Sequence, residues 1–205
     1  MERLYLTPGE MIAAYSAAGR GKLNRPTASL LLLGILAGAI IAVAGAATNT
    51  AAYGIADTVC ALLVPFGLGL VGVTGSELFT GNCMLPITLL DGGGTVGQLL
   101  RNWALSYLGN ILGAGLVAAL CVFCGQLDYS AGALAVYTIR VGAAKCAMSF
   151  GNAFGLGILC NFLVCLGVLA ANSAKDTAGR LLGAYLPVCF FVLCGFEHCI
   201  ANLYY

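Results

Sequence analysis

A long apolar segment, residues 62–90, is interrupted in its middle by the polar sequence GSELFTGN at residues 75–82. The segment is long enough to cross a bilayer, where a spanning helix needs about 20 apolar residues. Irregular backbone at membrane depth is tolerated only where it is buried in protein or lines a cavity. The sequence therefore predicts a broken spanning helix whose break marks a conduction or binding site.

The same interruption occurs a second time near the end of the chain. The sequence GFEHCIAN at residues 195–202 repeats the spacing Gly-x-Glu-x-x-x-x-Asn inside another apolar segment. The tetrapeptide LGIL also occurs twice, at 33–36 and 156–159. Three spans per repeat would place the two halves in opposite orientations, so we predict an inverted-topology repeat with its site near the membrane midplane, between the two breaks.

The composition excludes an ordinary soluble domain. Hydrophobic residues make up 60% of the 205 residues and charged residues 8%, whereas soluble domains contain roughly 25% charged residues. We therefore expect an all-α integral membrane protein. The net charge of +1 argues against a nucleic-acid partner, and the polar N-terminus followed by a long apolar run does not resemble a cleavable signal peptide.

The predicted organisation is an N-terminal arm followed by one transmembrane domain. Residues 1–26 read as a cytoplasmic amphipathic arm with a short helix at 11–18, and residues 27–205 as a single channel domain. Repeat one covers about 27–124, and repeat two, which is incomplete, about 141–205. The polar residues 48–57 and the segment containing Asp128 and Arg140 are predicted to be loops. We expect five spans, of which the second and fifth are broken: about 28–47, 62–90, 103–124, 146–171 and 181–205.

The basic residues predict the orientation. With the N-terminus in the cytoplasm of a cell with an inner or plasma membrane, only Arg140 and Lys145 lie outside. Cytoplasmic loops of membrane proteins are enriched in Lys and Arg, so this orientation is the expected one. The basic residues it places inside are Arg3, Arg20, Lys22, Arg25, Arg101, Lys175 and Arg180.

Two residues at the breaks can contact a solute in a pore. His198 is the only histidine, and an ionisable residue inside a membrane is by default a functional-site hypothesis. An imidazole titrates near pH ~6.5, so His198 could donate a hydrogen bond or a proton to a passing anion; alternatively it satisfies loop carbonyls. Thr80, in the first break, offers a hydroxyl opposite His198 or caps the adjacent helix.

Four further polar residues in the breaks are interpreted as braces of the loops. Glu77 and Glu197 are costly at this depth unless they are paired, and they can accept hydrogen bonds from the unpaired N–H groups of a broken helix. Asn82 and Asn202 can serve both N–H and C=O groups with one side-chain amide. We therefore expect these residues to hold the breaks together rather than to carry protons.

Taken together, the two breaks and the segment GILCN at 157–161 resemble the formate/nitrite transporter family, over the whole chain from Met1 to Tyr205. The resemblance implies an aquaporin-like protomer in a homopentamer, each protomer conducting small monovalent anions or their acids, such as formate, nitrite or hydrosulfide. The family has six spans, and no sixth apolar segment follows Tyr205, so we expect the last span to be missing.

The resemblance also implies roles for individual residues. Thr80 would lie at the central constriction, and Asn161 would be a pore-side amide, although it could equally be an interhelical clasp. Lys145 would attract anions at the outer mouth; from its position alone it is equally well an interfacial lysine. The remaining set, which could simply pack against lipid or helices, would form apolar constrictions that exclude hydrated ions by dewetting: Leu68, Leu78, Phe79 and Phe191.

Three alternatives to an anion channel stay open. Ten cysteines, including the pair Cys121 and Cys124 in a C-x-x-C spacing, would allow a membrane oxidoreductase, but thiols in apolar helices usually behave as small hydrophobes. A pore for neutral solutes would need neither His198 nor Lys145. A truncated, non-functional family member is the third reading. We expect no enzyme activity, no cofactor and no metal.

Overall fold

The computed structural model describes residues 3–54 and 62–205, and within them the regular elements are helices without a β-strand. The predicted connection at 55–57 and Cys60 lie outside the described residues. The helices are α1 (Pro8–Leu23), α2 (Thr27–Gly54), α4 (Pro65–Thr74), α5 (Phe79–Asn82), α6 (Pro86–Leu90), α7 (Val96–Phe123), η1 (Gln126–Asp128), α8 (Ala133–Cys146), α9 (Phe150–Ser173), α10 (Thr177–Leu193) and η2 (Ala201–Tyr204).

Three of the described helices, α2, α7 and α9, are long and apolar enough to cross a membrane. The helices α4 and α10 and the segment Phe79–Leu90 are apolar but shorter. Large hydrophobic side chains lie on the outside, for example Phe123 at 86% and Phe162 at 61% exposure, as expected of a surface that faces lipid or other apolar partners. The all-helical class is as predicted.

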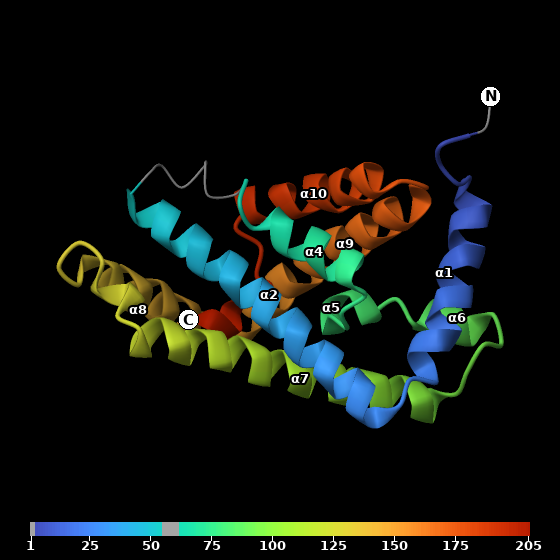
Figure 1. Cartoon of the computed structure of the whole chain (residues 1–205), viewed down its shortest axis with the longest axis horizontal. Helices are drawn as coiled ribbons and strands as arrows, with labels where there is room; N and C mark the ends of the chain where they lie inside the picture. The colour runs from blue at the N-terminus through green and yellow to red at the C-terminus, as the bar shows by residue number, and fades with distance from the viewer. Residues whose placement is uncertain (1–2, 55–61) are drawn as a thin grey trace.

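Helices α2 and α7 lie side by side (Figure 1), and glycines form their contact. Gly34 and Gly38 on α2 face Gly109 and Gly113 on α7, a small-xxx-small pattern on both helices that lets two backbones approach closely. A Cβ atom at Gly113 would collide with the carbonyl oxygen of Ile35. This close contact makes α2 and α7 the rigid frame against which the first break is held.

The predicted connection beginning at residue 48 is wrong, because α2 continues to Gly54. Thr48 and Thr50 donate their hydroxyls to carbonyls one turn back, at 2.7 and 2.9 Å. Asn49 is buried and donates to the hydroxyl of Thr138 on α8 at 2.7 Å. Local and cross-helix acceptors for the two threonine hydroxyls and for the side-chain N–H of Asn49 therefore let the helix continue through these polar residues.

The loop predicted around Arg140 is also wrong, because Arg140 and Lys145 lie in a separate helix, α8. Leu134 and Thr138 are its buried residues. The next helix, α9, begins at Phe150 rather than at Cys146, because the side chain of Ser149 accepts the N–H of Asn152 and caps it. Short amphipathic helices such as α8 lack the length that identifies a span from sequence alone.

The helix in the N-terminal arm is longer than the predicted 11–18. Helix α1 begins at Pro8, where Thr7 and Glu10 form a capping box. Its buried residues are Tyr15, Ser16, Gly19 and Leu23. The arm therefore lies against the rest of the protein along one face.

One end of the arm is held by Asp91, just after α6. The hydroxyl of Ser16 donates to the Asp91 carboxylate at 2.6 Å, and Arg20 lies 3.2 Å from the same oxygen. These two donors, Ser16 first, hold the pKa of Asp91 below its usual value. Docking of α1 is thus linked to the ionised form of Asp91.

Acid should loosen the arm. A carboxyl group with a lowered pKa stabilises the folded arm at pH values above the ordinary Asp pKa of ~3.9, and that stabilisation is lost as the pH falls below this value and through the folded-state pKa. Amide hydrogen exchange in α1, corrected for intrinsic rates, should therefore speed up in the wild type as the pH falls from about 5 to about 2. Asp91→Asn should exchange faster at pH 6 and respond less to acid; an unchanged acid response in Asp91→Asn would contradict this.

Candidate functional site

The two breaks have the same backbone geometry. Gly75 ends α4 with φ +66°, and Gly195 follows α10 with φ +67°. Both lie in the left-handed region, which glycine adopts without steric cost. The residue after each glycine donates its N–H to the carbonyl five residues back, at 3.1 and 2.9 Å, as in a helix-ending turn. The repeated Gly-x-Glu spacing thus corresponds to a repeated structure.

Inside each break the predicted glutamate and asparagine contact each other. Asn82 donates its side-chain N–H to Glu77, and Asn202 to Glu197, both at 2.7 Å. Each asparagine also donates its backbone N–H to the carbonyl four residues back at 3.0 Å. The carboxylate therefore links the start of each break to its end.

Each glutamate also pairs with a lysine from a preceding helix. Lys22 of α1 lies 3.0 Å from Glu77, and Lys145 of α8 lies 2.6 Å from Glu197. The two lysines precede their glutamates by 55 and 52 residues. Glu77 is fully buried and has a second cation, the Arg25 guanidinium, at 3.3 Å. The charge pattern of the sequence placed Lys22 and Arg25 on the cytoplasmic side without a partner. The separation of Lys22 from Glu77, similar to that of Lys145 from Glu197, is the signal that could have identified Lys22.

Helix α7 holds the first break from the other side, through residues that the sequence reasoning missed. The side-chain amide of Asn110 donates to the carbonyls of Gly34 and Glu77 at 2.7 and 3.0 Å, and accepts the N–H of Phe79 at 2.9 Å. The Trp103 indole N–H donates to the carbonyl of Asn82 at 2.9 Å. Polar side chains in an apolar helix are the signal that could have identified Asn110.

His198 and Thr80 meet between the two breaks. His198 Nε2 lies 3.0 Å from Thr80 Oγ1, and Nδ1 accepts the backbone N–H of Ala201 at 3.0 Å. Because Nδ1 is an acceptor, we assign the proton of a neutral ring to Nε2. The imidazole stacks on the ring of Phe191, with centroids 5.7 Å apart. The structure thus brings together the two residues predicted to contact the solute.

A narrow apolar gap lies on one side of His198. Its volume is about 10 Å³, roughly the room that one water molecule requires. Three of the four predicted constriction residues line it: Leu68, Leu78 and Phe191. The fourth, Phe79, lies against Trp103 and Tyr107 and lines a different cavity.

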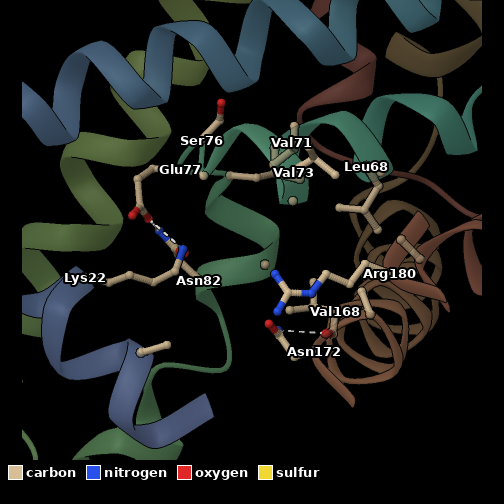
Figure 2. Close-up of a pocket in the computed structure, with 18 of the residues that line it drawn as sticks. Lys22, Leu68, Val71, Val73, Ser76, Glu77, Asn82, Val168, Asn172 and Arg180 are labelled. Atoms are coloured by element: carbon tan, nitrogen blue, oxygen red, sulfur yellow. Dashed lines mark hydrogen bonds and ion pairs between the residues drawn. The ribbon is translucent and has the colours of Figure 1, made fainter. Parts of the chain in front are cut away.

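The gap lies between two larger cavities. One, of about 240 Å³, shares Leu68 and Leu78 with the gap and is shown in Figure 2. The other, of about 720 Å³, shares His198 with it. Basic side chains line both: Lys22, Arg25 and Arg180 in the first cavity and Lys145 in the second.

The larger cavity also contains Asn161 and several thiols. Asn161 donates weakly to Cys165 Sγ at 3.7 Å, and among the described residues its buried Oδ1 accepts no hydrogen bond. The nine cysteines that the structure describes are all free. Within residues 3–54 and 62–205 no group of three or more His, Cys, Asp or Glu side chains is arranged to hold a metal ion.

The family follows from comparison with known proteins. A family model described as formate/nitrite transporter matches residues 9–205. The chain belongs to the formate/nitrite transporter family. This confirms the resemblance inferred from the two breaks, and it makes the protein a multi-pass membrane protein of a transporter family rather than of an enzyme family.

Individual members are similar over nearly the whole chain. A probable formate transporter of Methanothermobacter thermautotrophicus is 35% identical, covering 98% of this chain and 82% of that protein. A solved pentameric formate channel with formate bound is 33% identical, with a TM-score of 0.76 over 87% of this chain and 72% of its own. A solved FNT family ion channel is 27% identical, with a TM-score of 0.81 over 95% and 79%.

Proposed function

We propose that the protein is a channel or transporter for small monovalent anions or their conjugate weak acids, with formate, nitrite and hydrosulfide as the substrates to test. The observation that carries this is the His198–Thr80 pair, placed beside a water-sized apolar gap between two cavities lined by basic residues. Relatives named as formate transporters and channels support it.

The basic residues at the two cavities would concentrate anions at both ends of the path. Lys22, Arg25 and Arg180 line one cavity and Lys145 the other, and a cationic, low-dielectric mouth raises the local concentration of anions. Since Lys145 also pairs with Glu197, it has two roles in this proposal, bracing the second break and attracting the substrate. Asn161 lines the same cavity, where its side-chain N–H would donate a hydrogen bond to the substrate.

The apolar gap would exclude hydrated ions, and a hydrogen bond from His198 would replace part of the hydration shell that the substrate loses there. Leu68, Leu78 and Phe191 leave room for roughly one water molecule, so an ion must leave its hydration shell to pass. A hydrogen bond from His198 Nε2 to the substrate can replace part of that shell. Thr80 would add its hydroxyl, and Phe79 would narrow the path beyond it.

Proton donation by His198 requires a change from the geometry described. The neutral ring holds its proton on Nε2 while Nδ1 accepts the N–H of Ala201. To give its Nε2 proton to an anion and end as a neutral ring, His198 must first take up a proton from solvent at Nδ1, which requires that the Ala201 N–H move away. We propose this imidazolium state as the donor, so that the neutral acid crosses the gap.

The architecture we propose follows the family. The segment 27–205 forms one channel domain of two inverted repeats, in which α4 with α5–α6, and α10 with η2, are the two broken spans. The likeness of the two Gly-x-Glu breaks supports this, with both Glu–Asn pairs as braces. We propose a homopentamer in the lipid bilayer, after the solved pentameric formate channel, with the arm 1–26 in the cytoplasm of a cell with an inner or plasma membrane.

Replacing His198 should abolish most of the flux. In proteoliposomes, His198→Ala should reduce formate uptake by at least about tenfold, because a lost hydrogen bond of 1.5 kcal/mol or more at the barrier corresponds to that factor. Formate, nitrite and hydrosulfide would be measured in parallel, with glycerol as a neutral solute. Cys124→Ser, an exposed thiol at the end of α7, is the matched control. If the wild type carried none of the three anions, and glycerol passed both the wild type and His198→Ala, the proposal would be contradicted.

A further inference from the structure

The cavity of about 240 Å³ contains a cation that the ion pairs of the breaks do not use. Arg180 lies in the first turn of α10 and lines this cavity with Asn172 of α9. Figure 2 shows its guanidinium directed into the cavity, across from Lys22 and Glu77. The free end of this side chain is therefore available to a solute.

The contacts of Arg180 leave its guanidinium fork open. Its Nε donates to the carbonyl of Ala174 at 3.3 Å, which fixes the direction of the side chain. In the part of the chain that the structure describes, no carboxylate forms an ion pair with Arg180, whereas Lys22 and Arg25 share Glu77. The two Nη groups thus remain as unused donors.

Helix stability does not explain a basic residue at this position. Cations are unfavourable near a helix N-terminus because the backbone dipole is positive there. The helix is already capped by Asp176, which accepts the N–H of Gly179 at 2.8 Å. Arg180 is therefore placed against the local electrostatics of α10, as expected if it serves the cavity instead.

The neighbouring amide is also held in one orientation. Asn172 donates its side-chain N–H to the carbonyl of Val168 at 2.9 Å, as drawn in Figure 2. Its Oδ1 is the end left for the cavity, where it can accept a hydrogen bond from a guanidinium or from a protonated acid. A fork of donors and an acceptor thus line one cavity.

We infer that the Arg180 guanidinium forms a binding subsite for planar oxyanions, such as a small carboxylate, in the cavity before the apolar gap, with the acceptor Oδ1 of the neighbouring Asn172 left for the guanidinium or for a protonated acid. A guanidinium binds two oxygens of a planar anion at once, whereas an ammonium group acts as a point charge. The subsite therefore favours formate or nitrite over single-centre anions such as hydrosulfide or chloride. This inference deepens the proposed function and rests on it.

The decisive variant is Arg180→Lys, which keeps the charge and removes the fork. In proteoliposomes the half-saturating concentration of formate should rise about fivefold or more, as expected for losing a bidentate contact, while that of hydrosulfide changes less than about twofold. Arg140→Lys on α8, an exposed arginine far along the chain from this cavity, is the matched control. An equal rise in the half-saturating concentrations of formate and hydrosulfide would show general charge attraction only and would overturn the inference. An unchanged half-saturating concentration of formate in Arg180→Lys would overturn it as well.

A binding measurement separates this inference from the proposed function. Formate should raise the unfolding temperature of the detergent-solubilised wild type, because a ligand that binds the folded state stabilises it, and chloride at equal concentration should raise it less. In Arg180→Lys, formate should raise the unfolding temperature no more than chloride does. If the wild type carries no anion but shows this pattern, the transport proposal fails and the subsite stands; without a formate-specific shift in the wild type, the subsite fails.

Discussion

Glu77→Ala should destabilise the protein by about 3–5 kcal/mol, the usual cost of removing one partner from a buried ion pair. Glu77 is fully buried, pairs with Lys22 and Arg25, and accepts the amide of Asn82. Its loss leaves two cations facing a cavity wall without a counter-charge and frees the end of the first break. The measurement is thermal or denaturant unfolding in detergent, together with the yield of folded protein.

Two comparisons make this result specific to the buried charge cluster. Glu10→Gln removes the exposed pair with Arg3 and keeps a side-chain oxygen that can accept the N–H of Thr7 in the capping box; exposed pairs are worth about 0–1 kcal/mol. Combining Glu77→Ala with Lys22→Met should recover part of the loss, because one uncompensated cation is gone. If Glu77→Ala were no worse than Glu10→Gln, the carboxylate would not be holding the first break.

Gly113→Ala should separate α2 from α7 and destabilise the protein by about 1–3 kcal/mol, the usual cost of overpacking a tight contact. The added Cβ collides with the carbonyl of Ile35, a backbone atom that cannot rotate away. Because Asn110, three residues earlier on α7, holds both Gly34 and the first break, the shift should also reduce anion flux. Unfolding in detergent and formate uptake are measured on the same preparation.

Gly115→Ala is the matched control on the same helix. Nothing lies within 4 Å of a Cβ atom at Gly115, and alanine is favoured over glycine within a helix by roughly 0.5–1 kcal/mol. The two variants should therefore change stability in opposite directions. Equal behaviour of Gly113→Ala and Gly115→Ala would show that the glycine contact between α2 and α7 is not tight.

The breaks could be predicted because their signal is local. A glycine, a glutamate two residues later and an asparagine five residues after that, all within an apolar segment, give the same turn at 75–82 and 195–202. The last turns of α2 and the whole of α8 could not be predicted in this way, because their polar side chains resemble those of loops. Asn49 and Thr138 look like loop residues until their mutual hydrogen bond across 89 residues is known.

By itself, the sequence determined the membrane class, the two interruptions and the chemistry available at them, because hydropathy and residue spacing act within a single segment. The tertiary structure decided the partners that the sequence had left open: Lys22 and Arg25 for Glu77, and Asn110 for the first break. These contacts join residues tens of positions apart, and only helix packing brings them within hydrogen-bond distance. Any of several basic residues could have neutralised Glu77; the docking of α1 and of the turn that follows it brings Lys22 and Arg25 to the carboxylate.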